Sequence, residues 1–198
     1  MKRITVMVLA AILAIGVNSV AGVNAAATVE AQGIHGEITD SVRTGRWYGS
    51  NVEAQELTVA GIPMGAKFDA IAKSLGTPTN VNYLPGNGPL SSLEYGGIKY
   101  IAMPREDYVT MVEITNRDAT TARGIAVGDS MSRVYEVYGQ PLLVSSRNWN
   151  NQYFEPSWFY GRLYMGSEYI KGIWFANDGE KVTRIILVDG ITNYETDK

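Results

Sequence analysis

The chain has 198 residues, with no cysteine and a single histidine, His35. Without cysteine it cannot form a disulfide, a thiolate metal site or a cysteine nucleophile, and it cannot carry a lipid on an N-terminal cysteine. One histidine, placed in a stretch that we interpret as a leader, excludes a histidine-based triad and a multi-histidine metal site on the folded part. Paired carboxylates could still hydrolyse glycosides, but the spacing of the acidic residues selects no pair. The sequence therefore predicts no catalytic residue, no metal and no cofactor.

An excess of basic residues is also missing. The chain has 17 Lys and Arg beside 20 Asp and Glu, which gives a formal net charge of −3. Binding to a nucleic-acid backbone or to an anionic membrane surface needs a basic surface. The composition therefore argues against nucleic acid and against a polybasic membrane contact.

Long apolar runs are confined to the N-terminus. Lys2 and Arg3 precede a charge-free apolar run from Ile4 to about Val17, and small residues cluster at 25–27. This order predicts a secretory signal peptide over residues 1–27, cleaved after Ala25 or Ala27. The alternative is an uncleaved anchor, for which the run is short. We expect a secreted or periplasmic chain with no membrane span after cleavage; loss of two basic residues leaves 15 beside 20 acidic ones, a net charge of −5.

One phrase occurs twice in the chain. GIPMGAKFDAIAKSLGTP at 61–78 and GIAVGDSMSRVYEVYGQP at 124–141 align without a gap. Their shared positions form a structural repeat motif made of Gly61, Gly65, Gly76 and Pro78 and of Gly124, Gly128, Gly139 and Pro141. Apolar residues at helical spacing predict a short helix in each copy, followed by a glycine of left-handed conformation and a proline that prevents continuation. Asp129 or Ser130 can cap the second helix, whereas the first has a weaker start.

Strand-like segments follow each phrase. Leu90–Tyr95, Ile98–Met103 and Val109–Ile114 follow the first, and Ser157–Tyr164, Ile170–Phe175 and Val182–Leu187 follow the second. Residues 177–180 carry an Asp-Gly hairpin signal. The fold class that this predicts is α+β: two tandem repeats, each a short helix followed by a three-stranded antiparallel meander, with the helices packed on one face of the sheet. The predicted divisions are a largely irregular leader over 28–55, repeat units over 56–123 and 124–190, and a tail over 191–198.

Alternation along these strands predicts two different faces. We expect Ile101, Met103, Val112 and Ile114, and in the second unit Ile173, Phe175, Ile185 and Leu187, to face the helices. The same alternation buries Phe159 and Leu163. The residues expected to face outward are Tyr100, Ala102, Val109, Met111, Glu113, Trp158, Tyr160, Arg162, Tyr164, Trp174, Val182, Arg184 and Ile186.

The repeated phrase, the strands after it and the segment IWFANDGEKV (173–182) resemble the β-lactamase-inhibitor-protein-like fold, which is shared with the outer-membrane assembly lipoprotein (SmpA/OmlA) family. The resemblance covers about Glu56 to Asp189. It implies tandem units of a helix on a small antiparallel sheet, and a non-catalytic role in binding an enzyme or an assembly factor. The chain departs from both groups, because it has neither the disulfides of the inhibitors nor the lipidated cysteine of the assembly lipoproteins.

Two functions remain open from the sequence. The first is a non-catalytic protein-binding module whose partner is another envelope or extracellular protein. Its candidate partner-binding residues are an outward aromatic and arginine face together with a hairpin tip: Trp158, Tyr160, Arg162, Tyr164, Trp174, Arg184, Asp107 and Tyr108. The insert at Asn148–Asn151 is a further candidate recognition loop. The second function is a cell-wall or carbohydrate-associated protein, or a weak hydrolase, with the aromatic face stacked on sugar rings.

Overall fold

The computed structural model describes residues 37–38, 47–86, 88–103, 106–144, 147–149, 152–154, 157–164 and 169–191. The signal peptide, His35, Pro104, Arg105, Asn150 and Asn151 of the predictions lie outside these ranges. Within them, no helix combines the length and apolar character needed to cross a membrane.

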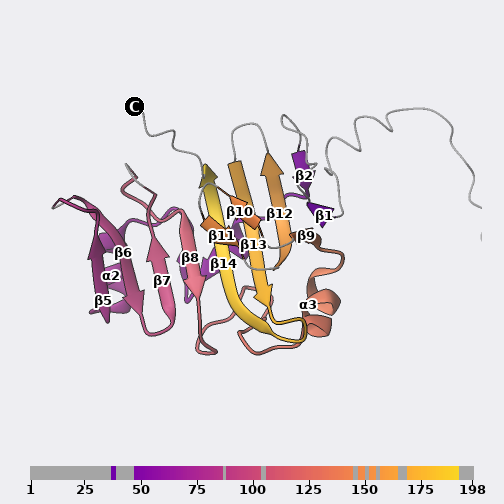
Figure 1. The fold of residues 1–198 in the computed structure, drawn as a ribbon. Coiled ribbons are helices and arrows are strands. Elements are labelled where there is room, and N and C mark those ends of the chain that lie inside the picture. The colour runs from indigo at the N-terminus through magenta and orange to yellow at the C-terminus, as the bar shows by residue number, and fades with distance from the viewer. Residues whose placement is uncertain are drawn as a thin grey trace, which may run out of the picture.

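The described residues form two α-helices, one 3₁₀ helix and fourteen strands (Figure 1). The helices are α2 (Phe68–Leu75) and α3 (Met131–Tyr138), and the 3₁₀ helix η1 is Ala54–Leu57. The strands before α3 are β1 (Glu37–Ile38), β2 (Trp47–Gly49), β3 (Thr58–Val59), β4 (Ile62–Pro63), β5 (Asn80–Tyr83), β6 (Leu90–Tyr95), β7 (Ile98–Ile101) and β8 (Met111–Ile114). The strands after it are β9 (Leu142–Val144), β10 (Arg147–Trp149), β11 (Gln152–Phe154), β12 (Ser157–Tyr164), β13 (Tyr169–Asn177) and β14 (Val182–Ile191).

Ten of these strands make one sheet. Its order is β1-β9-β12-β13-β14-β8-β7-β6-β5, and β2 pairs with β12 beside that path. All of its pairs are antiparallel except β1 with β9. The halves that follow the two helices meet where β14 pairs with β8, from Ile185 opposite Ile114 to Val188 opposite Met111.

The prediction of two helix-plus-three-strand repeats is wrong. The fold is mostly β, with one continuous sheet, and each half has a further strand directly after its helix, β5 in the first and β9 in the second. A three-stranded meander leaves unpaired backbone groups at its edges, and pairing β8 with β14 removes two such edges at once. The leader also contributes β1 and β2 to the sheet. The strand signal of β5 is weak because asparagine is depleted in strands, and that of β9 is weak because the strand has only three residues.

The helices and their ends agree with the sequence. Ser130 caps α3, since its hydroxyl accepts a hydrogen bond from the Arg133 N–H at 3.2 Å, whereas Lys67 at the matching position of α2 offers no side-chain cap. Gly76 and Gly139 end the two helices with φ of 83° and 79° and ψ of −146° and −147°. Their φ is positive as predicted, but the ψ places them in a region that is essentially restricted to glycine rather than in the left-handed helical region.

One core lies between the sheet and the helices. We call it the helix-side core, and its members come from both halves: Phe68, Ile71, Tyr100, Val112, Ile114, Met131, Val134, Ile173, Phe175, Ile185 and Leu187 are among them. The predicted alternation is confirmed for β8, β13 and β14, but it is inverted in β7, where Tyr100 and Ala102 are buried and Ile101 is half-buried. Tyr100 lies opposite Val112, and opposed residues of an antiparallel pair share a face. The predicted alternation in β7 is therefore one residue out of phase, and a shift of one residue exchanges the two faces of a strand. Val109 and Val182, which were expected to face outward, are also buried in this core.

A second core lies on the opposite face of the sheet, in its second half. This far-side core consists of Tyr48, Leu142, Phe159, Leu163, Ile170, Trp174 and Val188. The Phe159 ring covers two glycines that oppose each other across β12 and β13, Gly161 and Gly172. A Cβ on Gly172 would lie 2.6 Å from that ring and 2.5 Å from the Tyr160 carbonyl oxygen, so only glycine fits there.

Candidate functional site

The predicted aromatic face is divided between the two sides of the sheet. Trp158 lies opposite Phe175 and Tyr160 opposite Ile173, which places both on the helix side. Trp174 lies opposite Phe159 and belongs to the far-side core. The prediction that these side chains share one outward face is therefore wrong, because a one-residue error in the phase of β12 moves every side chain of that strand to the other face.

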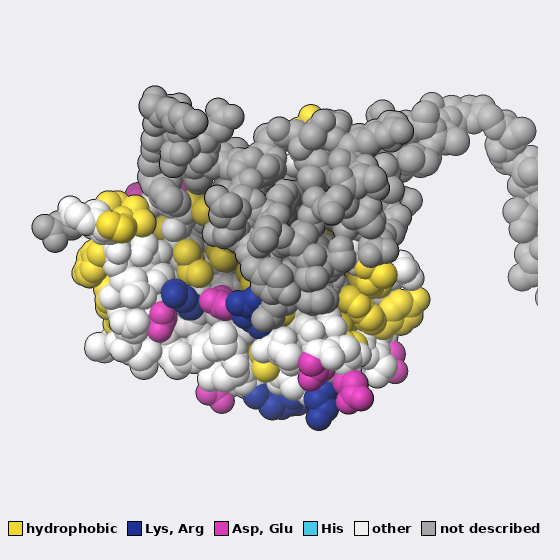
Figure 2. Space-filling view, viewed as in Figure 1, with side chains coloured by type: hydrophobic (Ala, Val, Ile, Leu, Met, Phe, Trp, Pro, Cys, Tyr) yellow, Lys and Arg dark blue, Asp and Glu magenta, His cyan; other side chains and the backbone are white. Residues whose placement is uncertain are grey.

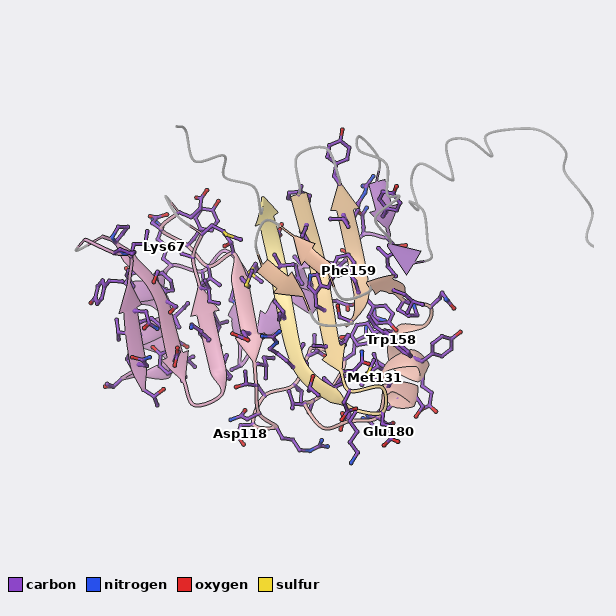
Figure 3. The ribbon with its side chains drawn as sticks, viewed as in Figure 1. Lys67, Asp118, Met131, Trp158, Phe159 and Glu180 are labelled. Atoms are coloured by element: carbon purple, nitrogen blue, oxygen red, sulfur yellow. The ribbon has the colours of Figure 1, made fainter. Side chains whose placement is uncertain are left out.

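Trp158 and Tyr160 hold α3 against the sheet. The Tyr160 ring centre lies 5.1 Å from that of Tyr138 and 5.8 Å from that of Phe175, and its hydroxyl donates to the Gly139 carbonyl oxygen at 2.9 Å. Burial raises the pKa of the Tyr160 hydroxyl. Trp158 meets Tyr135 of α3 edge to face at 6.3 Å, and Figure 3 shows it beside that helix. Both residues contact α3, so their contacts are internal.

Trp174 and the two arginines also make internal contacts. Trp174 is 4% exposed and its ring centre lies 4.5 Å from that of Phe159. Arg184 donates from Nη1 to Glu113 Oε1 at 3.0 Å across the β14–β8 junction, and Arg162 donates from Nη1 to Asn51 Oδ1 at 3.2 Å. Tyr164, at the end of β12, is half-buried.

The hairpin tip between β7 and β8 presents the remaining two candidates at the surface. Tyr108 is 37% exposed, and Asp107 Oδ2 accepts a hydrogen bond from Lys67 Nζ at 2.7 Å. That hydrogen bond and the accompanying charge lower the pKa of Asp107 and raise the pKa of Lys67. Two backbone hydrogen bonds, Gly65 N–H to the Val109 carbonyl at 2.8 Å and Val109 N–H to the Ala66 carbonyl at 2.9 Å, attach the tip to the turn before α2. These hydrogen bonds place Tyr108 opposite Lys67, beside the turn before α2.

A groove of about 390 Å³ lies beside this tip. We call it the tip groove; Met64, Met103, Tyr108, Val109 and Tyr169 supply its apolar walls, and Gly65, Glu106, Thr110, Asp189 and Gly190 complete it. The Tyr169 hydroxyl donates to Asp189 Oδ1 at 2.8 Å, and Lys171 Nζ lies 3.1 Å from Asp189 Oδ2. Burial raises the pKa of Tyr169 to about 12. The groove therefore combines apolar walls with the hydrogen-bonded polar groups of Tyr169 and Asp189.

A second hollow of about 380 Å³ adjoins the other side of the tip. It is lined by Lys67, Phe68, Asp69, Pro89, Leu90, Glu106 and Asp107, so Glu106 lines both hollows. Figure 3 places Lys67 toward the end of the sheet at which the β7–β8 hairpin turns. The tip thus stands between two concave surfaces.

The sequence did not identify Met64, Met103, Tyr169 or Asp189 as site residues. They come from four separate segments that only the β14–β8 junction and the turn before α2 bring together. The one sequence feature that could have pointed to this groove was the predicted hairpin tip. In the predicted insert, β10 and β11 pair with Asn148 opposite Tyr153 and Trp149 opposite Gln152, and Asn150 and Asn151 lie outside the described residues.

A third cavity, of about 220 Å³, lies where residues 49–56 meet the second half. Arg123 donates to Glu56 on its wall and also to the Val137 carbonyl oxygen at 3.2 Å, and its guanidinium lies 4.7 Å from the Tyr138 ring centre. Arg123 therefore connects η1 to α3.

The described carboxylates with shifted pKa values all shift downward. Lys99 lowers the pKa of Glu94, and the backbone N–H groups of Lys181 and Glu180 lower that of Asp178. Burial alone would raise the pKa of Asp129, but the Ala126 N–H and the Arg117 guanidinium outweigh it and the pKa is lowered. Among the described residues no group of three or more His, Cys, Asp and Glu side chains is placed to hold a metal ion.

No protein-family model matches the chain, and no curated protein or solved structure matches it. The resemblance to the β-lactamase-inhibitor-protein-like and SmpA/OmlA families therefore stays a prediction.

Proposed function

We propose that the chain is an exported, non-catalytic protein-binding module that receives its partner in the tip groove. The observation that carries the proposal is the make-up of this groove, which has methionine and tyrosine walls beside a hairpin tip that is hydrogen-bonded to the turn before α2. Methionine adapts to irregular apolar surfaces, and tyrosine is enriched among residues that dominate binding energy.

The charged groups in and beside the groove indicate how a partner would be recognised. Asp189 in the groove is paired with Lys171 and the Tyr169 hydroxyl, and Asp107 on the adjacent tip is paired with Lys67. Because these charges are already compensated, we expect affinity to come from an apolar or aromatic anchor side chain in the groove and specificity from hydrogen bonds to its polar groups.

Two further observations support the proposal. A general acid needs a raised pKa near neutral pH, whereas the described carboxylates with a shifted pKa are all shifted downward. The N-terminal sequence, with its basic start, apolar run and small residues, supports export and hence a partner in the envelope or outside the cell.

The test is affinity capture from envelope and culture-fluid proteins, followed by calorimetry with the purified partner. Tyr108→Ala should weaken binding by about 30-fold or more, as expected for a residue that dominates an interface. Tyr135→Ala is the matched control, because Tyr135 is 49% exposed on α3 and does not line the groove. Equal affinity of the wild type and Tyr108→Ala would contradict the proposal. Binding of soluble glycans by the wild type, with no captured protein, would favour the carbohydrate alternative instead.

A further inference from the structure

Within the described residues, β5 is the outermost strand at one end of the sheet and pairs only with β6 (Figure 1). The other end is built differently, because the leader strands β1 and β2 lie alongside β9 and β12. The two ends of the sheet are therefore not equivalent, and β5 presents backbone groups to its surroundings.

Val81 directs its backbone away from β6. Its N–H donates to the side-chain oxygen Oδ1 of Asn80 at 2.9 Å, while the neighbouring Asn82 carbonyl accepts from Ser91 Oγ of β6 at 3.1 Å. Consecutive residues of a strand direct their backbone groups to opposite sides. The N–H and C=O of Val81 are thus the groups that a further strand would meet, and the Asn80 side chain covers the first of them.

Apolar side chains accompany this edge. Val81 is 37% exposed and Tyr83 is 64% exposed. They lie opposite Leu93 and Leu90, which contact the helix-side core, so both project toward the face that carries the helices. In Figure 2 hydrophobic side chains gather at this end of the molecule. A strand added here would cover them as well as pair with Val81.

The strand carries neither a charge nor a proline that would oppose self-association. Its sequence is Asn-Val-Asn-Tyr, and its only edge protections are its length of four residues and a bulge after Asn82. Glu94 of β6, which accepts a hydrogen bond from Asn82, is itself paired with Lys99 of β7, whose Nζ lies 3.2 Å from its Oε1. Two copies of β5 can therefore meet without like charges opposing each other, which is the requirement for a symmetric pair.

We propose that β5 pairs antiparallel with β5 of a second copy of this chain, with the twofold axis at Val81. The Val81 N–H then leaves the Asn80 side chain and donates to the Val81 carbonyl of the other copy, and Asn80 of one copy lies opposite Asn82 of the other. Such a short pairing buries little surface, so the dimer is weak and concentration-dependent. This inference is independent of the tip groove.

Cysteine cross-linking tests the register directly, because the chain has no cysteine of its own. The Cα atoms of a directly opposed hydrogen-bonded pair are about 5.5 Å apart, within reach of a disulfide. The full-length Val81→Cys variant should form a disulfide dimer under mild oxidation about 10-fold faster than the Lys73→Cys variant, because pairing raises the effective concentration of the two thiols. Lys73 is exposed on α2 and serves as the collisional control. Equal rates for the two variants would overturn the proposal.

Sedimentation equilibrium of the wild type and three variants tests the energetics. Val81→Pro removes only an N–H that is not part of the β5–β6 ladder, and Val81→Lys opposes two positive charges at the axis; both should stay monomeric with an unchanged circular dichroism spectrum. Asn80→Ala exposes the Val81 N–H and should tighten the dimer by about 2- to 10-fold. A wild type that is monomeric at millimolar concentration overturns the proposal, and so does capture of a foreign extended segment at this edge by a monomer.

Discussion

The half of the sheet after α2 and the half after α3 differ in strand length and in the faces that they bury. Strands β6, β7 and β8 have 6, 4 and 4 residues, whereas β12, β13 and β14 have 8, 9 and 10. The first half contributes buried residues to the helix-side core only, and the second half contributes to both cores. The same phrase therefore begins two substructures, and the strands after it decide how much apolar surface each can bury.

The turn motif, by contrast, is geometrically the same in both halves. The φ values are 78° and 79° at Gly61 and Gly124, and 85° and 88° at Gly65 and Gly128. What differs is the residue after the second glycine, which is Ala66 in the first copy and the buried Asp129 in the second. The second copy has thus added polar interactions to a turn that the glycines already determine.

Separating the halves should have the largest effect. A chain that ends at Arg123 lacks β14, so β8 loses one of its two partner strands and the helix-side core loses the residues that β13, β14 and α3 supply. We expect complete loss of cooperative folding, because the remaining strands cannot close a core. Thermal unfolding followed by circular dichroism measures this, and a cooperative transition in the truncated chain would show that the first half is self-sufficient.

Substitutions in the far-side core should have the second-largest effect, and their cost in stability should differ between the two halves. Phe159 is 1% exposed, and Phe159→Ala should lower the free energy of unfolding by about 3–5 kcal/mol. Met111 contacts the same core from the first half but is only half-buried, so Met111→Ala should cost less than about 2 kcal/mol. Urea unfolding of both variants gives the comparison; equal losses would mean that the far-side core extends evenly over both halves.

The smallest of the three effects concerns Asp129. Its Oδ1 lies 2.7 Å from Arg117 Nη2, and its Oδ2 accepts from the Ala126 N–H at 3.0 Å. Asp129→Asn should lower the stability at pH 7 by about 1–3 kcal/mol, because a charged acceptor is lost beside two arginines.

The direction of the pKa shift of Asp129 predicts how this stability difference depends on pH. The pKa of Asp129 is lowered in the folded protein, so its contribution is complete above the ordinary value of 3.8 and disappears as the pH falls through the folded value. The wild type and the Asn variant should therefore become equally stable in acid. Ala66→Ser is a matched control in the first copy, where no such pH dependence is expected. A constant difference between the wild type and Asp129→Asn from pH 7 down to pH 2 would contradict this account.

Local features could be predicted from the sequence because they depend on neighbouring residues. The spacing of Phe68, Ile71 and Leu75 and of its counterparts gave both helices, and Gly76 and Gly139 gave their ends. The strands Leu90–Tyr95 and Ser157–Tyr164 have the predicted bounds. The hairpin tip with Asp107 and Tyr108 was also predicted as a candidate site, and these two predicted residues lie at the surface in the structure.

The faces of the strands and the single sheet were decided by tertiary structure. Whether Trp158 or Phe159 faces the helices depends on one residue of phase, and that phase is set by the pairing of β12 with β13 rather than by the composition of β12. The tip groove likewise needs Met64, Tyr108 and Asp189 from segments that are distant in sequence. The sequence by itself determined where the chain turns, because glycine conformation and helix capping are local. The pairing of β8 with β14 determined which surfaces are buried. Only the tertiary structure decided that pairing, because the backbone hydrogen bonds at a strand edge can be satisfied by any strand that the rest of the fold brings alongside.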